Sequence, residues 1–348
     1  MTYWKKKILT VMLQYDYGDK NRGYSGEKMW FHDNLKKMST KVEAFWYDDY
    51  LNDKFALEKD LMVKIDSLNP DLIFFVLYQD QFDPNFLKRL KEKYCTYCWF
   101  GDDQWRFDNF TKIYAPCFSF VSTTDPWSII KYNKIGISPI LTDWAAQQYS
   151  EEIGPLDLQE SYNYEVTFVG GYNHYRGWLI NTLTKKHGIN VECFGTGWPN
   201  GRVSYEQMEN IFRKSKINLN ISNSASHDIR FIFGDIRNLK EWLTSTKRSE
   251  QVKARNFEIP LAGGFQLTNY SLGLERHFII GDEVAVYNNP EECANQIFFY
   301  LENDGLRRGI VQKSHTKAKE NHNYIERLNS IMENIFNSAS KMEKYGEA

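Results

Sequence analysis

Cysteine, excess charge and long apolar runs are all scarce in this sequence. Of its 348 residues five are cysteines, and Lys and Arg nearly balance Asp and Glu, which leaves a net charge of −2. Few cysteines in an odd number do not build a disulfide framework, and they favour a reduced, cytoplasmic setting. The near-neutral charge argues against nucleic acid as a partner, because a phosphate backbone is bound by an excess of cations.

The apolar run near the start, within MTYWKKKILTVMLQY, is too short to span a bilayer and lacks a small-residue cleavage site. We expect it to form a first β-strand. The cluster of Lys5, Lys6 and Lys7 leaves peripheral contact with the inner face of a membrane open. Three lysines at the start of a strand are more often simply solvated.

The Cys-x-x-Cys pair does not favour a metal or redox site. Cys95 and Cys98 lie in the strand-like run YCTYCWF, where residues three apart point to opposite faces. Thiols on opposite faces cannot share a metal ion. We predict no metal site in this chain.

Two series of alternating apolar runs and polar, periodic segments are present, and the length suits two domains. Such strand and helix repeats predict parallel sheets with helices on both faces. Between the series, a polar and acidic segment carries Gly154 and Pro155. We predict an α/β protein with two Rossmann-like domains in tandem and an interdomain cleft: a domain over 1–150, a linker over 151–164, a domain over 165–315, and a helix over 316–348 that returns to the first domain.

Ligands of open α/β sheets bind at the carboxyl ends of the strands. In the second series these ends carry glycine turns, which let backbone N–H groups approach a phosphate, and polar side chains that could meet sugar hydroxyls. Ordinary turns, strand caps and a core tryptophan explain the same residues about as well. The candidates for donor binding are Gly170, Gly171, Arg176, Gly195, Thr196, Gly197, Trp198, Asn220 and Ser222.

The segment SEQVKARNFEIPLAGGFQLT combines charges with a glycine turn. Lys253, Arg255 and Glu258 lie within two helical turns, and Gly263 and Gly264 end the helix before a strand. An exposed, ion-paired helix face would show the same residues. The chemistry alone therefore leaves a binding role and a surface role open.

This segment resembles the CgeB-like glycosyltransferases, which have the group 1 type C-terminal domain. The shared residues are R-x-F-E at Arg255, Phe257 and Glu258, the small-residue turn at Ala262, Gly263 and Gly264, and the returning strand FQLT. The similarity continues through GLERHFIIGDEVAVYNNPEECANQIFFYL and reaches back to Arg176 and CFGTGW. It covers roughly the second half of the chain, whereas the first half matches only in layout and in WFGDD.

The resemblance implies a GT-B enzyme that moves a sugar from a nucleotide-sugar, UDP- or GDP-linked, without a metal or other cofactor. It implies that Glu258 binds the ribose and that Phe257 lies in the donor site. It also implies that Lys253, Arg255 and Arg176 neighbour the diphosphate, whose growing charge needs stabilisation when it leaves. The acceptor stays open between a glycan, for example in bacterial surface polysaccharide synthesis, a lipid-linked sugar and a protein.

Retaining members of the wider superfamily carry two glutamates separated by seven residues, and Glu250 and Glu258 have that spacing. Those members place a glycine-rich turn after the first glutamate, where this chain has Gln251, Val252 and Lys253. The role of Glu250 in catalysis and the choice between retention and inversion therefore stay open.

In the first series, Asp102 and Asp103 directly follow a buried strand. If the enzyme inverts, either could be the general base for the acceptor hydroxyl. A loop with a helix cap explains the pair equally simply. His32 could line the acceptor side, although a satisfied helix histidine is the more common case.

Two other functions share this layout. A nucleotide-sugar epimerase would bind the same donor without an acceptor, and a two-lobed sugar-binding protein would also have two α/β domains. The second is disfavoured because no export signal is recognisable in the sequence.

Overall fold

The structure is a computed structural model that describes residues 3–151, 154–157 and 160–345. The chain divides into two compact units. Unit 1 is Met1–Asp143 with Tyr324–Ala348, and unit 2 is Trp144–Asn323. Each has its own hydrophobic core, as the prediction of two α/β domains requires.

Unit 1 contains a six-stranded, fully parallel sheet in the order β2-β1-β3-β4-β5-β6. Ile8 of β1 pairs in register with Val42 of β2 and Leu72 of β3. Apolar runs buried on both faces form these central strands, as expected for a parallel sheet. The strands are β1 (Trp4–Met12), β2 (Ser39–Trp46), β3 (Leu72–Val76), β4 (Thr96–Phe100), β5 (Phe120–Thr123) and β6 (Ile140–Leu141).

Two of the longer helices of unit 1 begin at side-chain caps. The Asp53 carboxylate accepts the Ala56 N–H, and the Asp83 carboxylate accepts the Asn85 N–H just before Pro84 opens the next helix. The α-helices are α1 (Asp33–Met38), α2 (Lys54–Leu68), α3 (Pro84–Lys93), α4 (Asp103–Arg106), α5 (Lys112–Tyr114), α6 (Ile129–Lys134) and α14 (Tyr324–Tyr345). Short 3-10 or π segments are η1 (Asp16–Gly18), η2 (Lys20–Arg22), η3 (Lys28–His32), η4 (Asp48–Tyr50), η5 (Phe107–Thr111), η6 (Ala115–Cys117) and η7 (Pro126–Ser128).

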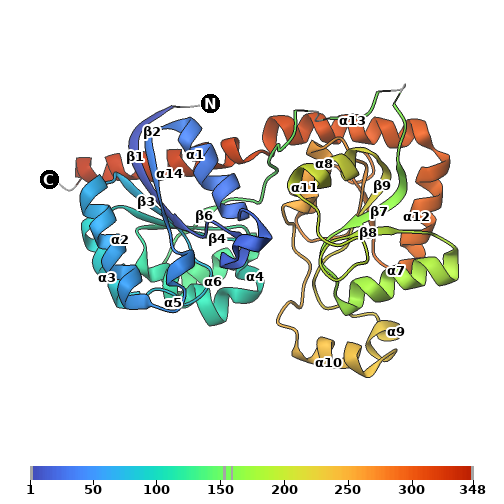
Figure 1. Cartoon of the computed structure of the whole chain (residues 1–348), viewed down its shortest axis with the longest axis horizontal. Helices are drawn as coiled ribbons and strands as arrows, with labels where there is room; N and C mark the ends of the chain where they lie inside the picture. The colour runs from blue at the N-terminus through green and yellow to red at the C-terminus, as the bar shows by residue number, and fades with distance from the viewer. Residues whose placement is uncertain (1–2, 152–153, 158–159, 346–348) are drawn as a thin grey trace. The chain divides into compact units, whose positions relative to one another are not determined.

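Helix α14 packs within unit 1, although it is the last helix of the chain (Figure 1). The ring of Tyr324 stacks on Trp30 at 5.3 Å and meets Phe31 edge-on at 5.6 Å. Farther along, Phe336 contacts Trp4 at 5.4 Å. The chain thus enters unit 1 again at Tyr324, later than the predicted boundary at residue 316.

Unit 2 contains a five-stranded parallel sheet in the order β11-β10-β9-β7-β8. The strand order by position in the unit is 2-1-3-4-5-6 in unit 1 and 2-1-3-4-5 in unit 2, so the winding reverses between β1 and β3 and between β7 and β9. The carboxyl end of such a reversal is the usual ligand crevice of a doubly wound sheet. The strands are β7 (Tyr164–Val169), β8 (Glu192–Phe194), β9 (Ser215–Asn220), β10 (Gln266–Asn269) and β11 (Ala285–Tyr287).

Helices cover both faces of the second sheet. Phe168 packs with the residues of α7 and α12, whereas its neighbour Val169 packs with those of α8 and α11, as alternation along a strand dictates. The helices are α7 (His174–His187), α8 (Tyr205–Arg213), α9 (Ile229–Ile232), α10 (Ile236–Thr244), α11 (Arg255–Leu261), α12 (Pro290–Glu302) and α13 (Asp304–Asn321), with the 3-10 turn η8 (Leu274–Arg276).

The helices α9 and α10 were not anticipated from the sequence and extend away from the sheet of unit 2 (Figure 1). Asp228 and Asp235 cap them by accepting N–H groups two residues ahead. Phe233 and Ile236 are each 76% exposed. Two signals in the sequence could have indicated this insertion: the aspartates at the helix starts, and the helical spacing of Ile236, Leu239 and Leu243.

The predicted linker over 151–164 belongs to unit 2, and its residues 152–153 and 158–159 lie outside the described part. Glu160 binds Arg213 through both carboxylate oxygens, at 2.7 and 3.0 Å. Within the described residues no helix is long and apolar enough to cross a membrane.

Candidate functional site

Arg176 lies at the reversal point of the second sheet. It sits in the first turn of α7, where the Asn173 side chain accepts its N–H. Its Nη1 donates to the Gly171 carbonyl and its Nη2 to the Ile221 carbonyl, both at 2.7 Å. Nε donates to the Ser222 carbonyl at 3.2 Å. The guanidinium therefore links the loops that follow β7 and β9. Its first role is structural, because these hydrogen bonds hold the two loops together at the crevice.

The positive charge of Arg176 also lies near two other predicted site residues, Glu250 and Arg255. Burial and, to a smaller extent, the nearby charge of Arg255 lower the pKa of Arg176 to about 10, while Tyr287 and Glu250 oppose the shift. The structure therefore brings Arg176, Glu250 and Arg255 within electrostatic reach of one another, although they come from separate segments.

Glu250 is a half-buried carboxylate at the carboxyl edge of the same sheet. Burial raises the pKa of Glu250, whereas hydrogen bonds with Ser222, Asn269 and Ser224 and the charge of Arg176 act to lower it. The Ser222 hydroxyl is also 2.9 Å from that of Ser224. The carboxylate thus lies among side chains that can donate to it.

A pocket of about 370 Å³ opens beside Glu250. The last residues of two strands and the residues directly after them supply part of its wall, as the carboxyl-edge rule predicts. They are Asn269 and Tyr270 at the end of β10, and Tyr287 and Asn288 at the end of β11. The sequence analysis identified both strands but named none of these four residues as a candidate.

Glu258 is 7% exposed and faces Arg255, whose Nη1 lies 2.7 Å from its Oε2. Burial raises the pKa of Glu258, Arg255 acts to lower it, and Glu209 of α8 adds to the rise. The Arg255 guanidinium also lies over the Phe212 ring at 5.2 Å. The Glu258 carboxylate is thus buried between α8 and α11. Its role in binding the ribose stays a prediction.

Phe257 is not a donor contact. Its side chain is fully buried and packs on Phe278 at 5.9 Å and on His322 at 5.0 Å. Helix α11 is buried from Asn256 to Leu261, and the apolar residue of R-x-F-E packs in one of the two core clusters that the helix contacts. Lys253 precedes the helix, and its Nζ lies 6.0 Å from the Trp144 ring centre.

The two glycine turns after β7 and β8 touch each other. The Gly170 N–H donates to the Phe194 carbonyl at 2.8 Å, and that of Gly195 donates to the Gly201 carbonyl at 2.6 Å. Gly195 has φ +127°, and a Cβ there would lie 2.3 Å from the Gly170 carbonyl oxygen. Close packing of the two loops explains these glycines. The N–H groups of Gly170 and Gly195 already donate to backbone carbonyls, so they are not available to a phosphate.

The second half of the CFGTGW turn holds the loop after β7. The Thr196 carbonyl accepts the Tyr172 N–H at 2.8 Å, and the Trp198 Nε1 donates to the Gly170 carbonyl at 2.9 Å. A Cβ at Gly197 would meet the Tyr172 Cβ at 2.7 Å. Trp198 and Tyr172 also line a second pocket.

Asn220 ends β9 and is half-buried, in register with Thr268 of β10. Asn218, on the same face, is buried and structural, since its amide nitrogen donates to the Phe212 carbonyl at 2.9 Å.

In unit 1, Asp103 is a core residue and is withdrawn as a candidate base. It is fully buried, and its two oxygens accept from the Thr111 hydroxyl at 2.6 Å and the Tyr132 hydroxyl at 2.8 Å. Burial raises the pKa of Asp103 to about 6. Asp102 is half-buried just before α4, so it is the accessible member of the pair, and its role as base stays a prediction.

His32 is likewise part of the core of unit 1. Its Nδ1 lies 2.8 Å from the Thr10 hydroxyl oxygen, and its ring meets Trp46 edge-on. Burial lowers the pKa of His32 to about 4, as expected for a satisfied helix histidine.

Residues 176–333 match a family described as Glycosyl transferase-like. No curated protein matches the chain.

Solved glycosyltransferase structures share the two-unit fold at low identity. Sucrose-phosphate synthase from Thermosynechococcus elongatus aligns with a TM-score of 0.66 and 8% identity, over 96% of this chain and 100% of that one. The Anabaena protein Alr3699/HepE in complex with UDP aligns with a TM-score of 0.62 and 12% identity, over 95% and 100%. Phage T4 BGT in complex with UDP-glucose aligns with a TM-score of 0.54 and 12% identity, over 94% and 99%. The fold is therefore GT-B.

Proposed function

We propose that this chain, a glycosyltransferase of the GT-B fold, takes its sugar from a UDP-linked donor that unit 2 binds at the carboxyl ends of β7, β9 and β10. The observation that carries the proposal is the convergence of Arg176, Glu250 and Arg255 at that edge. The choice of UDP follows the ligands of Anabaena Alr3699/HepE and phage T4 BGT.

We assign to these groups a stronger interaction with the transition state than with the bound substrate. A departing nucleoside diphosphate gains negative charge, and cations held in a partly buried site stabilise that charge more in the transition state than in the ground state. Arg176 and Arg255 supply such cations. Glu250 is the acceptor for hydroxyl groups of the transferred sugar, because its carboxylate lines the pocket at this edge of the sheet and lies near the charge of Arg176.

The proposal includes a metal-independent reaction, as in the CgeB-like group. It also includes a cytoplasmic location, supported by the free thiols of all five cysteines. The acceptor class we assign is a glycan hydroxyl, as in bacterial surface polysaccharide synthesis. Peripheral contact with the inner face of a membrane is compatible with this assignment.

The first test is calorimetry with UDP, GDP, CDP and dTDP in EDTA, followed by transfer or hydrolysis assays with the sugar conjugates of the nucleotide that binds. We expect UDP to bind, and Arg255→Met to weaken it by about tenfold or more, because a charge-assisted hydrogen bond is lost. Glu250→Gln should keep UDP affinity within about threefold yet lower the turnover by about 100-fold.

Glu206→Gln and Arg89→Met are matched controls, because both side chains are exposed and lie outside the pocket. Circular dichroism verifies that each variant is folded. Failure of every nucleotide to bind, or full turnover in Glu250→Gln, would remove the assignment of this site. Release of an epimerised donor without transfer would instead identify an epimerase.

A further inference from the structure

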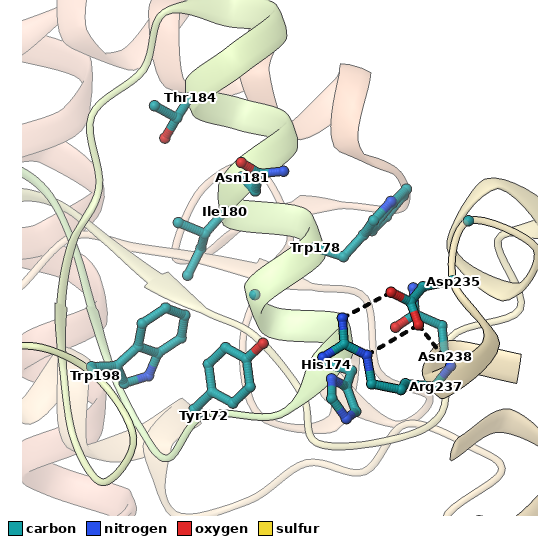
Figure 2. A pocket seen from close by; sticks show the side chains of 12 residues that line it. Tyr172, His174, Trp178, Ile180, Asn181, Thr184, Trp198, Asp235, Arg237 and Asn238 are labelled. Carbon is teal, nitrogen blue, oxygen red and sulfur yellow. Dashed lines mark hydrogen bonds and ion pairs between the residues drawn. The ribbon is translucent and has the colours of Figure 1, made fainter. Parts of the chain in front are cut away.

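A second pocket, of about 630 Å³, lies in unit 2 between α7 and α10. It is lined by residues other than those around Glu250. Figure 2 shows Tyr172 and Trp198 on one side of α7 and Trp178 on the other. Asn181 and Thr184 also project from α7, Thr184 farther along the helix (Figure 2). Of these side chains only Trp198 is also a predicted donor contact.

The aromatic wall is held in place by its surroundings. Tyr172 is 47% exposed and meets Trp198 at 5.1 Å with an interplanar angle of 73°. Gly177 of α7 provides the space for this ring, since a Cβ there would lie 2.6 Å from it. Trp198 is anchored through Nε1 to Gly170. The rings thus present faces to the pocket in a fixed geometry.

The pocket also offers hydrogen-bonding groups to a ligand. Within the described part of the chain, neither the Tyr172 hydroxyl nor the Asn181 amide has a hydrogen-bond partner. Both lie at exposed positions of the pocket. An amide offers a donor and an acceptor together, which suits vicinal hydroxyl groups.

The charge of the pocket is already balanced. Arg237 donates to Asp235 from Nε at 3.1 Å and from Nη2 at 2.9 Å (Figure 2). A guanidinium that already makes two hydrogen bonds to a carboxylate has few N–H donors and little net charge to offer a phosphate. The pocket therefore favours a neutral ligand with apolar faces and hydroxyl edges.

We propose that this pocket binds a neutral oligosaccharide, a glycan site separate from the donor pocket. The ring C–H groups of a pyranose pack on aromatic faces, while its hydroxyls meet the Tyr172 hydroxyl and the Asn181 amide. The volume lies within the range of small-ligand sites, about 300–1,000 Å³. The inference rests on the proposed function, because it gives a sugar-transferring enzyme a hold on a glycan chain.

The test is ligand-observed NMR and calorimetry of the full chain with maltotriose, cellotriose, chitotriose and mannotriose. We expect at least one to bind, and Tyr172→Ser and Asn181→Ala each to weaken it by about threefold to tenfold, the loss of one packed ring or hydrogen bond. Asn295→Ala, at an exposed position of α12 away from the pocket, is the matched control and should bind as the wild type does.

The affinity of the same variants for UDP separates the hypothesis of an oligosaccharide site from that of the donor site. Unchanged UDP affinity in Tyr172→Ser with lost oligosaccharide binding supports the second site. Oligosaccharide binding that survives both substitutions, or no binding by any of the four probes, overturns it while leaving the UDP result to judge the donor site.

Discussion

At the scale of single residues, Asp103 gives the unfolding free energy a pH dependence of known sign. Its pKa rises from 3.8 to about 6 on folding because the carboxyl is buried. The folded state therefore binds the proton more tightly, so the unfolding free energy falls as the pH rises through that window and is constant above it. The contribution of this group is about 3 kcal/mol.

Urea denaturation of the wild type and Asp103→Asn between pH 4 and 7 measures this contribution, since other groups titrate equally in both. We expect the stability difference between the two proteins to change by about 2 kcal/mol over this range, in favour of the wild type at low pH, because the full effect is reached only below the unfolded pKa. Parallel curves would mean that Asp103 titrates normally and is more hydrated than its contacts with Thr111 and Tyr132 indicate.

Several predicted site residues serve packing at this scale. Phe257 and Asp103 are core residues, and Gly170 and Gly195 allow two loops to meet. Residue type does not separate these roles, because a glycine at a strand end can face a phosphate or another loop. The contacts of the fold decide which of the two it faces.

At the scale of elements, the glycine that ends α11 is required by a close approach to the segment after Ser150. Gly263 has φ +77°, and a Cβ would lie 2.0 Å from the carbonyl carbon of Gly154 and 2.2 Å from the nitrogen of Pro155. Both partners are backbone atoms and cannot turn away. We expect Gly263→Ala to lower the unfolding free energy by about 3 kcal/mol or more.

Gly188→Ala is the control for the backbone term alone, since its φ is +68° and nothing lies within 4 Å of the added Cβ. It should cost about 1 kcal/mol. Chemical denaturation of the full chain compares the two. Equal losses would show that the contact with Gly154 and Pro155 relaxes without cost.

At the scale of the whole molecule, the last helix stabilises the unit that begins the chain. The buried face of α14 includes Leu328, Ile331, Met332 and Ile335, which pack in unit 1. Ending the chain after Asn323 removes this face. We expect unit 1 to lose about 5 kcal/mol or more, from the burial of several large apolar side chains.

Hydrogen exchange followed by mass spectrometry measures the effect separately in each unit. Protection in β1–β6 should fall while that in β7–β11 persists, because unit 2 has its own core. Glu333→Ala, at an exposed position of α14, should change neither. Loss of protection in both sheets would show that the two units unfold together.

The sequence by itself determined the two parallel α/β series and most strand positions, because buried parallel strands need unbroken apolar runs and their crossover helices need periodic ones. It did not predict α9 and α10, which are short, lie between two strands of the sheet in the chain, and place Ile229, Ile236 and Leu243 at exposed positions. It also indicated the carboxyl edge of the second sheet as the site, since strand ends can be read along the chain.

Only the tertiary structure decided which of those residues meet. Arg176, Glu250 and Asn269 lie far apart in the sequence and converge where β7, β9 and β10 end, whereas Glu258 turns towards Arg255 and α8. Strand order and helix rotation set these contacts through long-range packing. A local pattern of residues does not encode them, because the same charges would fit an exposed face equally well.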